Sequence, residues 1–228
     1  MSRCNLTKTL FQSDRFEFSN MMKKSKLKHL NLSHNNFSNT GLEILLTCLP
    51  SGLNNLDITG CNLAPSSSLD QLASSFVNHC QQGSPNCDLI SLSISSLTLS
   101  DSGLIQLSSS LQYCGRLLHL YMDHNLVSAK GLLGVLKTIL EQSVPVTRLS
   151  CAMEEQTSKQ FWSDKTTTEE VIEVTEQLLS SNCSRLELMV LPYSQDSAAC
   201  LSKLWNSYYK SRSKHSRDGL GNIVFSVQ

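Results

Sequence analysis

The chain has 228 residues, 40% of them hydrophobic and 17% charged, which is enough apolar content for a core and too much for a disordered chain. Its 19 basic and 19 acidic residues balance, so no partner of strong overall charge is implied. No apolar run approaches the roughly 20 residues of a membrane span, and no segment has the form of a secretory signal. The nine cysteines include no CxxC pair, and we expect them to be reduced and intracellular.

The first part of the chain differs from the rest. Residues 1–26 contain no full copy of the repeat described below, and we interpret them as an incomplete repeat or an N-terminal flank. Residues 27–228 form the repeat array, with degenerate copies towards the end. Repeat arrays carry a polar cap at each end. Because no such cap is visible, we expect the chain to be the end of a longer protein.

The clearest repeat reads LKHLNLSHNNFSNTGLEILLTCL from Leu27. Leu27, Leu30 and Leu32 give an L-x-x-L-x-L frame, Asn35 follows it, and Gly41 precedes an apolar run with helical spacing. Copies of this frame begin at Leu27, Leu53, Leu89, Leu117, Val146, Cys183 and Leu220. The unit is 28–29 residues long, with insertions of about eight residues in three places.

The frame has a direct structural meaning. Residues at spacing two lie on one face of a strand, and the Asn side chain can bond the backbone at the bend that follows, with Cys61 as a weaker substitute. Gly relieves the turn before the helix. One unit cannot bury its apolar face alone, so units must stack. We therefore predict an α/β leucine-rich-repeat solenoid of the ribonuclease-inhibitor type, with a curved parallel sheet inside, helices outside and about seven repeats. Strands should begin near residues 29, 55, 91, 119, 148, 185 and 222.

The last third of the chain keeps the alternation of helix and strand in weaker form. Residues 164–181 have acidic residues in the first turns and an apolar stripe, which predicts a helix. Residues 196–210 have a similar pattern. The final NIVFSVQ alternates like an edge strand.

Several stretches resemble the C-terminal leucine-rich-repeat region of the Tonsoku-like family of replication-fork repair scaffolds. They are LKHLNLSHNNFSNTGLEILLTCLPSG, LISLSISSLTLSDSGLIQL, FWSDK and the closing GNIVFSVQ. The resemblance covers roughly residues 25–228 and implies a nuclear scaffold surface that holds a partner protein in a complex supporting homologous recombination at stalled forks. The histone-reading ankyrin repeats of the family are not in this sequence, so histone reading is not carried over.

Catalytic and metal chemistry find little support in the pattern. A Cys–His pair such as Cys114 and His119 could in principle act as a nucleophile, but both lie at positions that the repeat explains. His79, Cys80 and Cys87 lack a fourth zinc ligand at a suitable spacing. There is no phosphate-binding glycine loop or dinucleotide fingerprint. We expect no enzyme activity, no metal and no cofactor.

The strand residues between the leucines should face the concave side of the sheet. Tyr121 is the best single anchor there, because aromatic side chains near the centre of an interface tend to carry binding energy. His119 and Asp123 flank it and could supply polar specificity. The candidate partner-binding residues are His29, Asn31, Ser33, Asn55, Asp57, Thr59, His119, Tyr121 and Asp123. Ser91, Ser93 and Ser95 share these positions, and for them an ordinary solvated strand is an equally good interpretation.

Two basic clusters near the ends of the chain could contact the phosphates of a nucleic acid. The first consists of Lys23, Lys24, Lys26 and Lys28, and the second of Lys210, Arg212, Lys214 and Arg217. A solvated flank is the favoured alternative, because short basic clusters are common.

These observations predict a protein-interaction scaffold rather than an enzyme. The resemblance implies that it belongs to a nuclear complex that repairs stalled or collapsed forks. A DNA-binding element that uses the basic ends, and a generic leucine-rich-repeat adaptor unrelated to repair, are the alternatives. We expect protein partners first and nucleic acid second, with no membrane and no small-molecule substrate.

Overall fold

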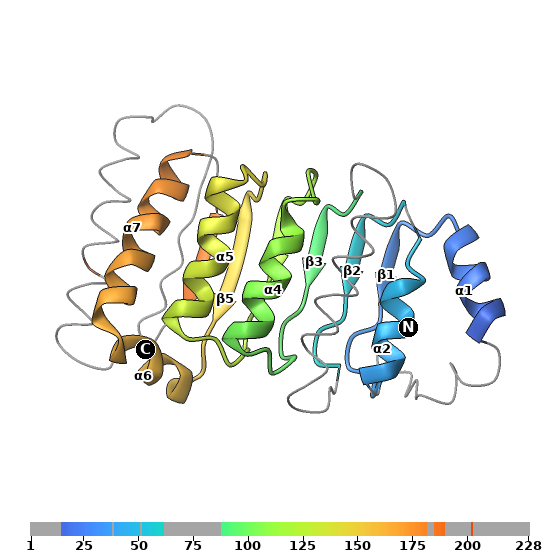
Figure 1. Cartoon of the computed structure of the whole chain (residues 1–228), viewed down its shortest axis with the longest axis horizontal. Helices are drawn as coiled ribbons and strands as arrows, with labels where there is room; N and C mark the ends of the chain where they lie inside the picture. The colour runs from blue at the N-terminus through green and yellow to red at the C-terminus, as the bar shows by residue number, and fades with distance from the viewer. Residues whose placement is uncertain are drawn as a thin grey trace.

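The computed structural model describes residues 15–37, 39–50, 52–61, 88–181, 185–189 and 202. Within these residues six parallel strands form one sheet in chain order (Figure 1). They are β1 (His29–Asn31), β2 (Asn55–Asp57), β3 (Ser91–Ser93), β4 (His119–Tyr121), β5 (Arg148–Ala152) and β6 (Arg185–Met189). Each begins at the residue predicted for it, which confirms a parallel sheet with one strand per repeat. The seventh predicted strand, near residue 222, lies outside the described residues.

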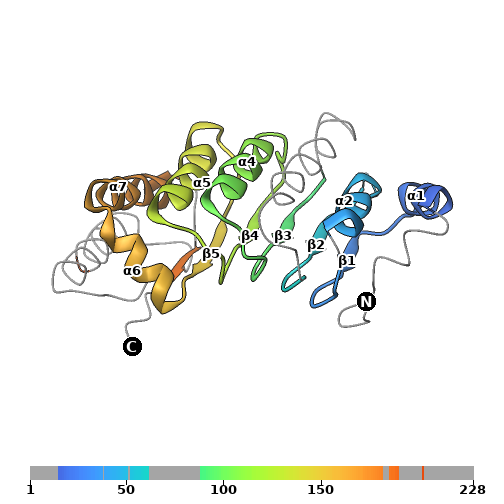
Figure 2. The same ribbon diagram turned by 60° about the horizontal axis from the view of Figure 1, so that its bottom comes forward.

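The described helices cover one face of this sheet. They are α1 (Arg15–Lys24), α2 (Asn39–Thr47), α4 (Asp101–Leu111), α5 (Ala129–Glu141), α6 (Glu155–Ser163) and α7 (Lys165–Ser181). Figure 2 shows α2, α4, α5 and α7 in a row over the sheet, with α1 at the β1 end of the row. Among the described residues, no helix is long and apolar enough to cross a membrane. The arrangement is a mixed α/β fold compatible with leucine-rich repeats.

Two helices were not expected from the sequence, and one expected helix falls outside the description. Helix α1 occupies part of the segment that we interpreted as an incomplete repeat or an N-terminal flank, and its Met22 is buried in the core. Helix α6 escaped prediction because two of its buried residues, Thr157 and Ser158, are polar and give no apolar periodicity. The predicted helix 164–181 is confirmed as α7. Of the predicted helix 196–210, only residue 202 is described.

The core is built from leucines that lie side by side on neighbouring strands. The register pairs Leu30 with Leu56, Leu92, Leu120 and Leu149 in succession, and all five side chains are buried. The leucine that opens each frame is also buried in the repeats that begin at residues 53, 89 and 117, whereas Leu27 is 41% exposed. Leu27 precedes β1, the edge strand of the described sheet, where a neighbouring repeat packs on one side only.

Asn125 is the clearest polar link between two repeats. Its side chain is buried, and its Nδ2 donates to the carbonyls of Ile94 and Met122 at 3.0 and 2.9 Å. Its Oδ1 accepts from the backbone N–H groups of Leu97 and Leu99 at 3.0 and 3.2 Å. The preceding repeat has Leu97 where Asn would stand, so Asn125 serves the bends of both repeats. This bonding confirms the predicted role of the Asn position.

The bends after β1 to β4 place a residue in the left-handed region of backbone conformation at the same position of the repeat. The φ angles are +56° at His34, +62° at Gly60, +54° at Ser96 and +54° at His124, and these are equivalent positions of four repeats. Only Gly60 adopts this conformation without steric cost. A Cβ atom at Gly60 would lie 2.5 Å from the Nδ1 atom of His34, so close packing requires glycine there as well.

Gly131, at the glycine position of its repeat, has a different role from the predicted one of relieving the turn before the helix. Gly131 lies inside the first turn of α5, and its φ is not positive. A Cβ atom there would lie 2.3 Å from Oδ1 of Asp101. That carboxylate accepts hydrogen bonds from the backbone N–H of Ser128, at 2.7 Å, and from its hydroxyl. Gly131 therefore makes room for the Asp101 carboxylate that links the start of α4 to the start of α5.

The segment FWSDK has a structural explanation. The Phe161 ring is buried and meets the Trp162 ring edge-on, with centroids 5.1 Å apart. The Asp164 carboxylate accepts from the N–H and the hydroxyl of Thr167 at 3.1 and 2.6 Å. These bonds lower the pKa of Asp164 and cap the first turn of α7.

Replacing Asn125 with Ala should destabilise the protein by about 3 kcal/mol or more, because two buried N–H groups and two carbonyls lose their partner. Urea unfolding followed by circular dichroism measures the change. Asn36→Ala, at an exposed asparagine in the same type of bend, should change the free energy of unfolding by less than about 0.5 kcal/mol. Equal effects of the two substitutions would contradict the role assigned to Asn125.

Replacing His124 with Gly should stabilise the protein by about 0.5–1 kcal/mol, because the left-handed conformation costs a residue with a Cβ about 1–2 kcal/mol and glycine loses part of this gain through its greater unfolded-state entropy. The shift in the thermal unfolding midpoint gives the sign. His29→Gly provides the control, because His29 is exposed and extended in β1, and there the same substitution should destabilise.

Candidate functional site

The face of the sheet opposite the helices, called here the open face, carries the residues between the buried leucines. Strands β1 to β4 alternate between a buried central leucine and more exposed neighbours. The register aligns these neighbours in two rows that cross the sheet. The first row is His29, Asn55, Ser91, His119, Arg148 and Arg185. The second is Asn31, Asp57, Ser93, Tyr121, Ser150 and Glu187.

Polar side chains of β1 to β3 bond one another across the second row. Nδ2 of Asn31 donates to Oδ2 of Asp57 at 2.9 Å, and Oδ1 of Asp57 accepts from the N–H of Thr59, also at 2.9 Å. The hydroxyls of Thr59 and Ser93 lie 2.6 Å apart. Ser33 was predicted to face the partner, but it is only 6% exposed and donates its N–H and hydroxyl to Asn31. The chain bends back towards the core directly after β1, and this bend buries Ser33.

The Asp123 carboxylate is committed to internal contacts. Its Oδ1 accepts from the hydroxyl of Ser150 and from the N–H of Ala152, both at 2.7 Å. The buried Ser95 accepts from the N–H of Asp123 at 3.1 Å. The expectation that Asp123 supplies polar specificity for a partner stays a prediction, and these bonds give the carboxylate a structural role as well. A carboxylate placed after β4 meets the donors of the next strand, and its main role is to join β4 to β5.

Tyr121 lies half-buried on β4, the fourth of the six described strands, between the side chains of Arg148 and His119. The guanidinium carbon of Arg148 lies 5.1 Å from the centroid of its ring, a cation–π distance. The ring of His119 meets it edge-on at 6.4 Å. The structure brings these three side chains together and confirms that His119 and Tyr121 are neighbours. Arg148 was missed, although it occupies in the weak copy VTRLSCA the position that His119 occupies in its own repeat.

The open face is hollowed on the β3 side of Tyr121. The depression has a volume of about 320 Å³ and is lined by residues of β1, β2 and β3 together with Tyr121. It forms because Ser91 and Ser93 are short and stand between the longer side chains of Asn55 and Asp57 and the ring of Tyr121. His29, Asn31, Asn55 and Asp57 from the predicted set all line it. Thr59 lies beyond its edge.

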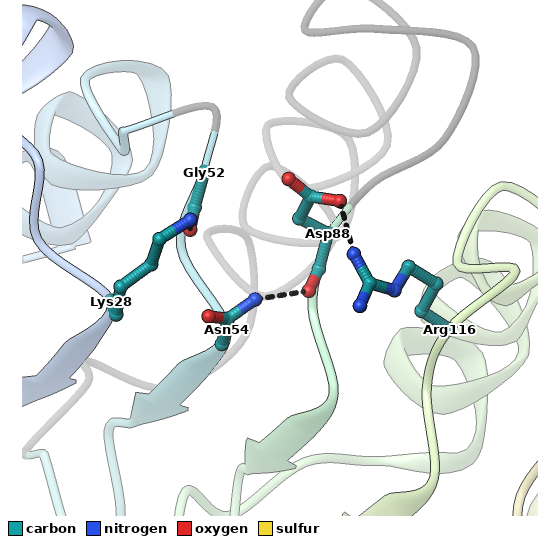
Figure 3. Close-up of polar contacts among 5 residues, drawn as sticks. All are labelled: Lys28, Gly52, Asn54, Asp88 and Arg116. Atoms are coloured by element: carbon teal, nitrogen blue, oxygen red, sulfur yellow. Dashed lines mark hydrogen bonds and ion pairs between the residues drawn. The ribbon is translucent and has the colours of Figure 1, made fainter.

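The N-terminal ends of the strands carry a second series of polar links (Figure 3). Lys28, one of the predicted phosphate contacts, donates its ammonium to the carbonyl of Gly52 at 2.9 Å. Nδ2 of Asn54 donates to the carbonyl of Asp88 at 2.9 Å, and the Asp88 carboxylate forms an ion pair of 2.9 Å with Arg116. These contacts lie at the N-terminal ends of β1 to β4, and the Lys28 ammonium takes part in one of them.

The other predicted phosphate contacts form no shared surface within the described residues. Lys23 and Lys24 end helix α1, and Lys26 follows it, with all three side chains exposed. Lys210, Arg212, Lys214 and Arg217 lie outside the described residues. Only the first basic cluster therefore has a described position.

Two of the buried cysteines in the described segments, Cys61 and Cys151, keep their thiols neutral near pH 7. Cys48, Cys61, Cys114 and Cys151 are free and buried. Burial raises the pKa of the Cys61 thiol to about 11 and that of the Cys151 thiol to about 12. Neutral thiols are neither nucleophiles nor metal ligands. The trio His79, Cys80 and Cys87 lies outside the described residues, and in those that are described no three metal-ligating side chains cluster.

Comparison with known proteins gives no family. No protein-family model and no curated protein matches the sequence. Among solved structures, the chain is similar to leiomodin-1 actin-binding site 2, with a TM-score of 0.45 and 9% identity over 90% of this chain and 93% of that chain. It is also similar to the C-terminal domain of Caenorhabditis elegans tropomodulin, with a TM-score of 0.41 and 14% identity over 89% of this chain and 98% of that chain. Both TM-scores are below 0.5, so neither likeness carries an argument about function.

The raised thiol pKa values predict that stability falls at alkaline pH. Unfolded cysteines lose their protons above an ordinary pKa of 9.0, whereas Cys61 and Cys151 keep theirs until about pH 11 and 12. The stabilisation is complete below pH 9 and is lost as the pH rises from 9 towards these values. Between pH 8 and 10.5, Cys151→Ala should lose about 1–2 kcal/mol less than the unchanged chain, as measured by urea unfolding. Parallel losses in the two proteins would show that other groups cause the alkaline effect.

Proposed function

We propose that this chain is a leucine-rich-repeat module of about seven repeats that binds a protein partner on its open face. The observation that carries the proposal is Tyr121, which is held by Arg148 and His119 beside a depression in the middle of the face. A half-buried aromatic side chain with fixed neighbours binds a partner with little loss of side-chain entropy. The surrounding strands are hydrogen-bonded on both sides and present a rigid support.

The biological setting that we propose rests on the sequence resemblance. The quoted repeat, FWSDK and the closing strand sequence resemble the Tonsoku-like family, which points to a nuclear scaffold in the homologous-recombination repair of stalled or collapsed replication forks. In this proposal the module holds a protein of that complex and performs no catalytic step. Nucleic acid is a secondary partner, because the exposed Lys28 already donates to the carbonyl of Gly52, which leaves Lys23, Lys24 and Lys26 as the other exposed lysines of the first cluster.

Replacing Tyr121 with Ala should weaken binding of the partner by about 1–3 kcal/mol, the usual range for a central aromatic residue. The tagged chain captures proteins from nuclear extract, and mass spectrometry compares their amounts between the unchanged chain and the variant. Binding of the purified partner is then measured by calorimetry. Tyr113→Ala, at a tyrosine 36% exposed just after α4 on the helix side, is the matched control and should leave binding unchanged.

Three outcomes would contradict parts of this proposal. Normal binding by a folded Tyr121→Ala variant, with loss in Tyr113→Ala, would move the interface to the helices. Loss of binding in a Lys23→Glu, Lys24→Glu, Lys26→Glu triple variant, together with steep salt dependence, would favour the DNA-binding alternative. Capture of a strong partner unrelated to fork repair would favour a generic adaptor.

A further inference from the structure

The depression beside Tyr121 has the chemistry of a site for one side chain. Its floor is Ser91 and Ser93, which contribute two hydroxyl groups and little bulk. The Asp57 carboxylate stands on the β2 side, and the Tyr121 ring stands on the β4 side. The depression has a volume of about 320 Å³, which is large enough to hold a long side chain from another protein.

The charge of the residues that line the depression determines the charge of the side chain that it can bind. Asp57 is the one carboxylate among the residues that line the depression, and none of them is a lysine or arginine. Each oxygen of Asp57 accepts one internal hydrogen bond, from Asn31 or from Thr59, and a carboxylate oxygen has a second lone pair to offer. The internal bonds fix the direction of the carboxylate and leave acceptor capacity towards the depression.

The Tyr121 ring, on the opposite side of the depression from Asp57, also favours a positively charged side chain. The face of a tyrosine ring attracts cations, and Arg148 already shows this on the Tyr121 ring, at 5.1 Å. Arg148 belongs to β5, on the other side of β4 from the depression. The ring therefore has positive charge on its β5 side and the Asp57 carboxylate across the depression on its β3 side.

The charge of the open face differs between β2 and β5 and gives an incoming segment a direction. On the β5 side Arg148 stands beside His119 of β4, whereas Asp57 stands on β2. A cation is repelled from that end and attracted to the Asp57 end.

We propose that the depression binds a lysine or arginine side chain presented by the protein partner. The carboxylate of Asp57 forms the ion pair, the hydroxyls of Ser91 and Ser93 accept further hydrogen bonds, and the Tyr121 ring covers the aliphatic stem or the guanidinium plane. This inference rests on the proposed protein-binding function and specifies the chemistry of the partner at the open face. Asp57 and Tyr121 are then specificity-determining residues of one subsite.

The probe for this proposal is a phage library of random twelve-residue peptides, selected against the full chain. Selected peptides should carry a conserved arginine or lysine, and replacing that residue with glutamine in the synthetic peptide should weaken binding about tenfold, measured by fluorescence anisotropy. This readout changes the peptide alone and is independent of the folding of any protein variant.

Protein variants locate the effect. Asp57→Asn, which keeps the shape of the carboxylate, should weaken the arginine peptide about tenfold and leave its glutamine version unchanged. Ser91→Phe fills the depression without touching a contact of Asp57, and should abolish binding of the arginine peptide. Glu141→Gln removes the same charge from an exposed position at the end of α5 and should change neither affinity.

The outcomes separate this inference from the proposed function. If the selected peptides lack a required basic residue, or carry an acidic one, the cation site is overturned. The cation site is also overturned if every selected peptide binds the Ser91→Phe variant as well as it binds the unchanged chain. In each of these cases the proposed function stands if Tyr121→Ala still loses the partner captured from nuclear extract, and falls only if that capture is unchanged.

Discussion

The side-by-side pairing of parallel strands, which places one buried leucine of each repeat against the next, is the constraint on which the rest of the structure depends. Strands β1 to β4 have three residues each and bury a single central leucine. An isolated strand and helix of this size could not offset the entropy of ordering the chain. Stability therefore belongs to the series of contacts between repeats, and a defect in one repeat is felt by its neighbours.

Polar groups reinforce this dependence because many find their partners in an adjacent repeat. Asn125 bonds the bend that precedes it by one repeat, Asp101 links the starts of α4 and α5, and Asp123 joins β4 to β5. Buried polar groups are costly unless they are paired. These bonds fix the spacing and register of the repeats and make slippage by one residue unfavourable.

The same bonds decide which side chains remain available to a partner. Asp123 and Ser33 lie at positions that alternate correctly with the leucines, yet their polar atoms are used inside the protein. Asp57 also accepts internal bonds, but unlike Asp123 and Ser33 it borders a depression, towards which its remaining lone pairs are available. The residue paired with Tyr121 on β3 is Ser93. Because its side chain is short, one side of the Tyr121 ring borders that depression. Function on the open face thus depends on what internal bonding leaves over.

The sequence by itself determined the repeat length, the starts of six strands, their parallel order and the role of Asn125, because these follow from the spacing of leucines and from local bends. It also singled out Tyr121 and the rows on the open face. The tertiary structure alone decided that Asp123 and Lys28 form hydrogen bonds within the protein, that Gly131 makes room for Asp101, that Arg148 packs on Tyr121, and that the short side chains of Ser91 and Ser93 open a depression. Each of these facts depends on which atoms of two repeats meet in space. A single contact between residues more than 20 positions apart produces no periodic pattern in the sequence. Leucines repeated at a fixed spacing do produce such a pattern, and it predicts which residues are buried.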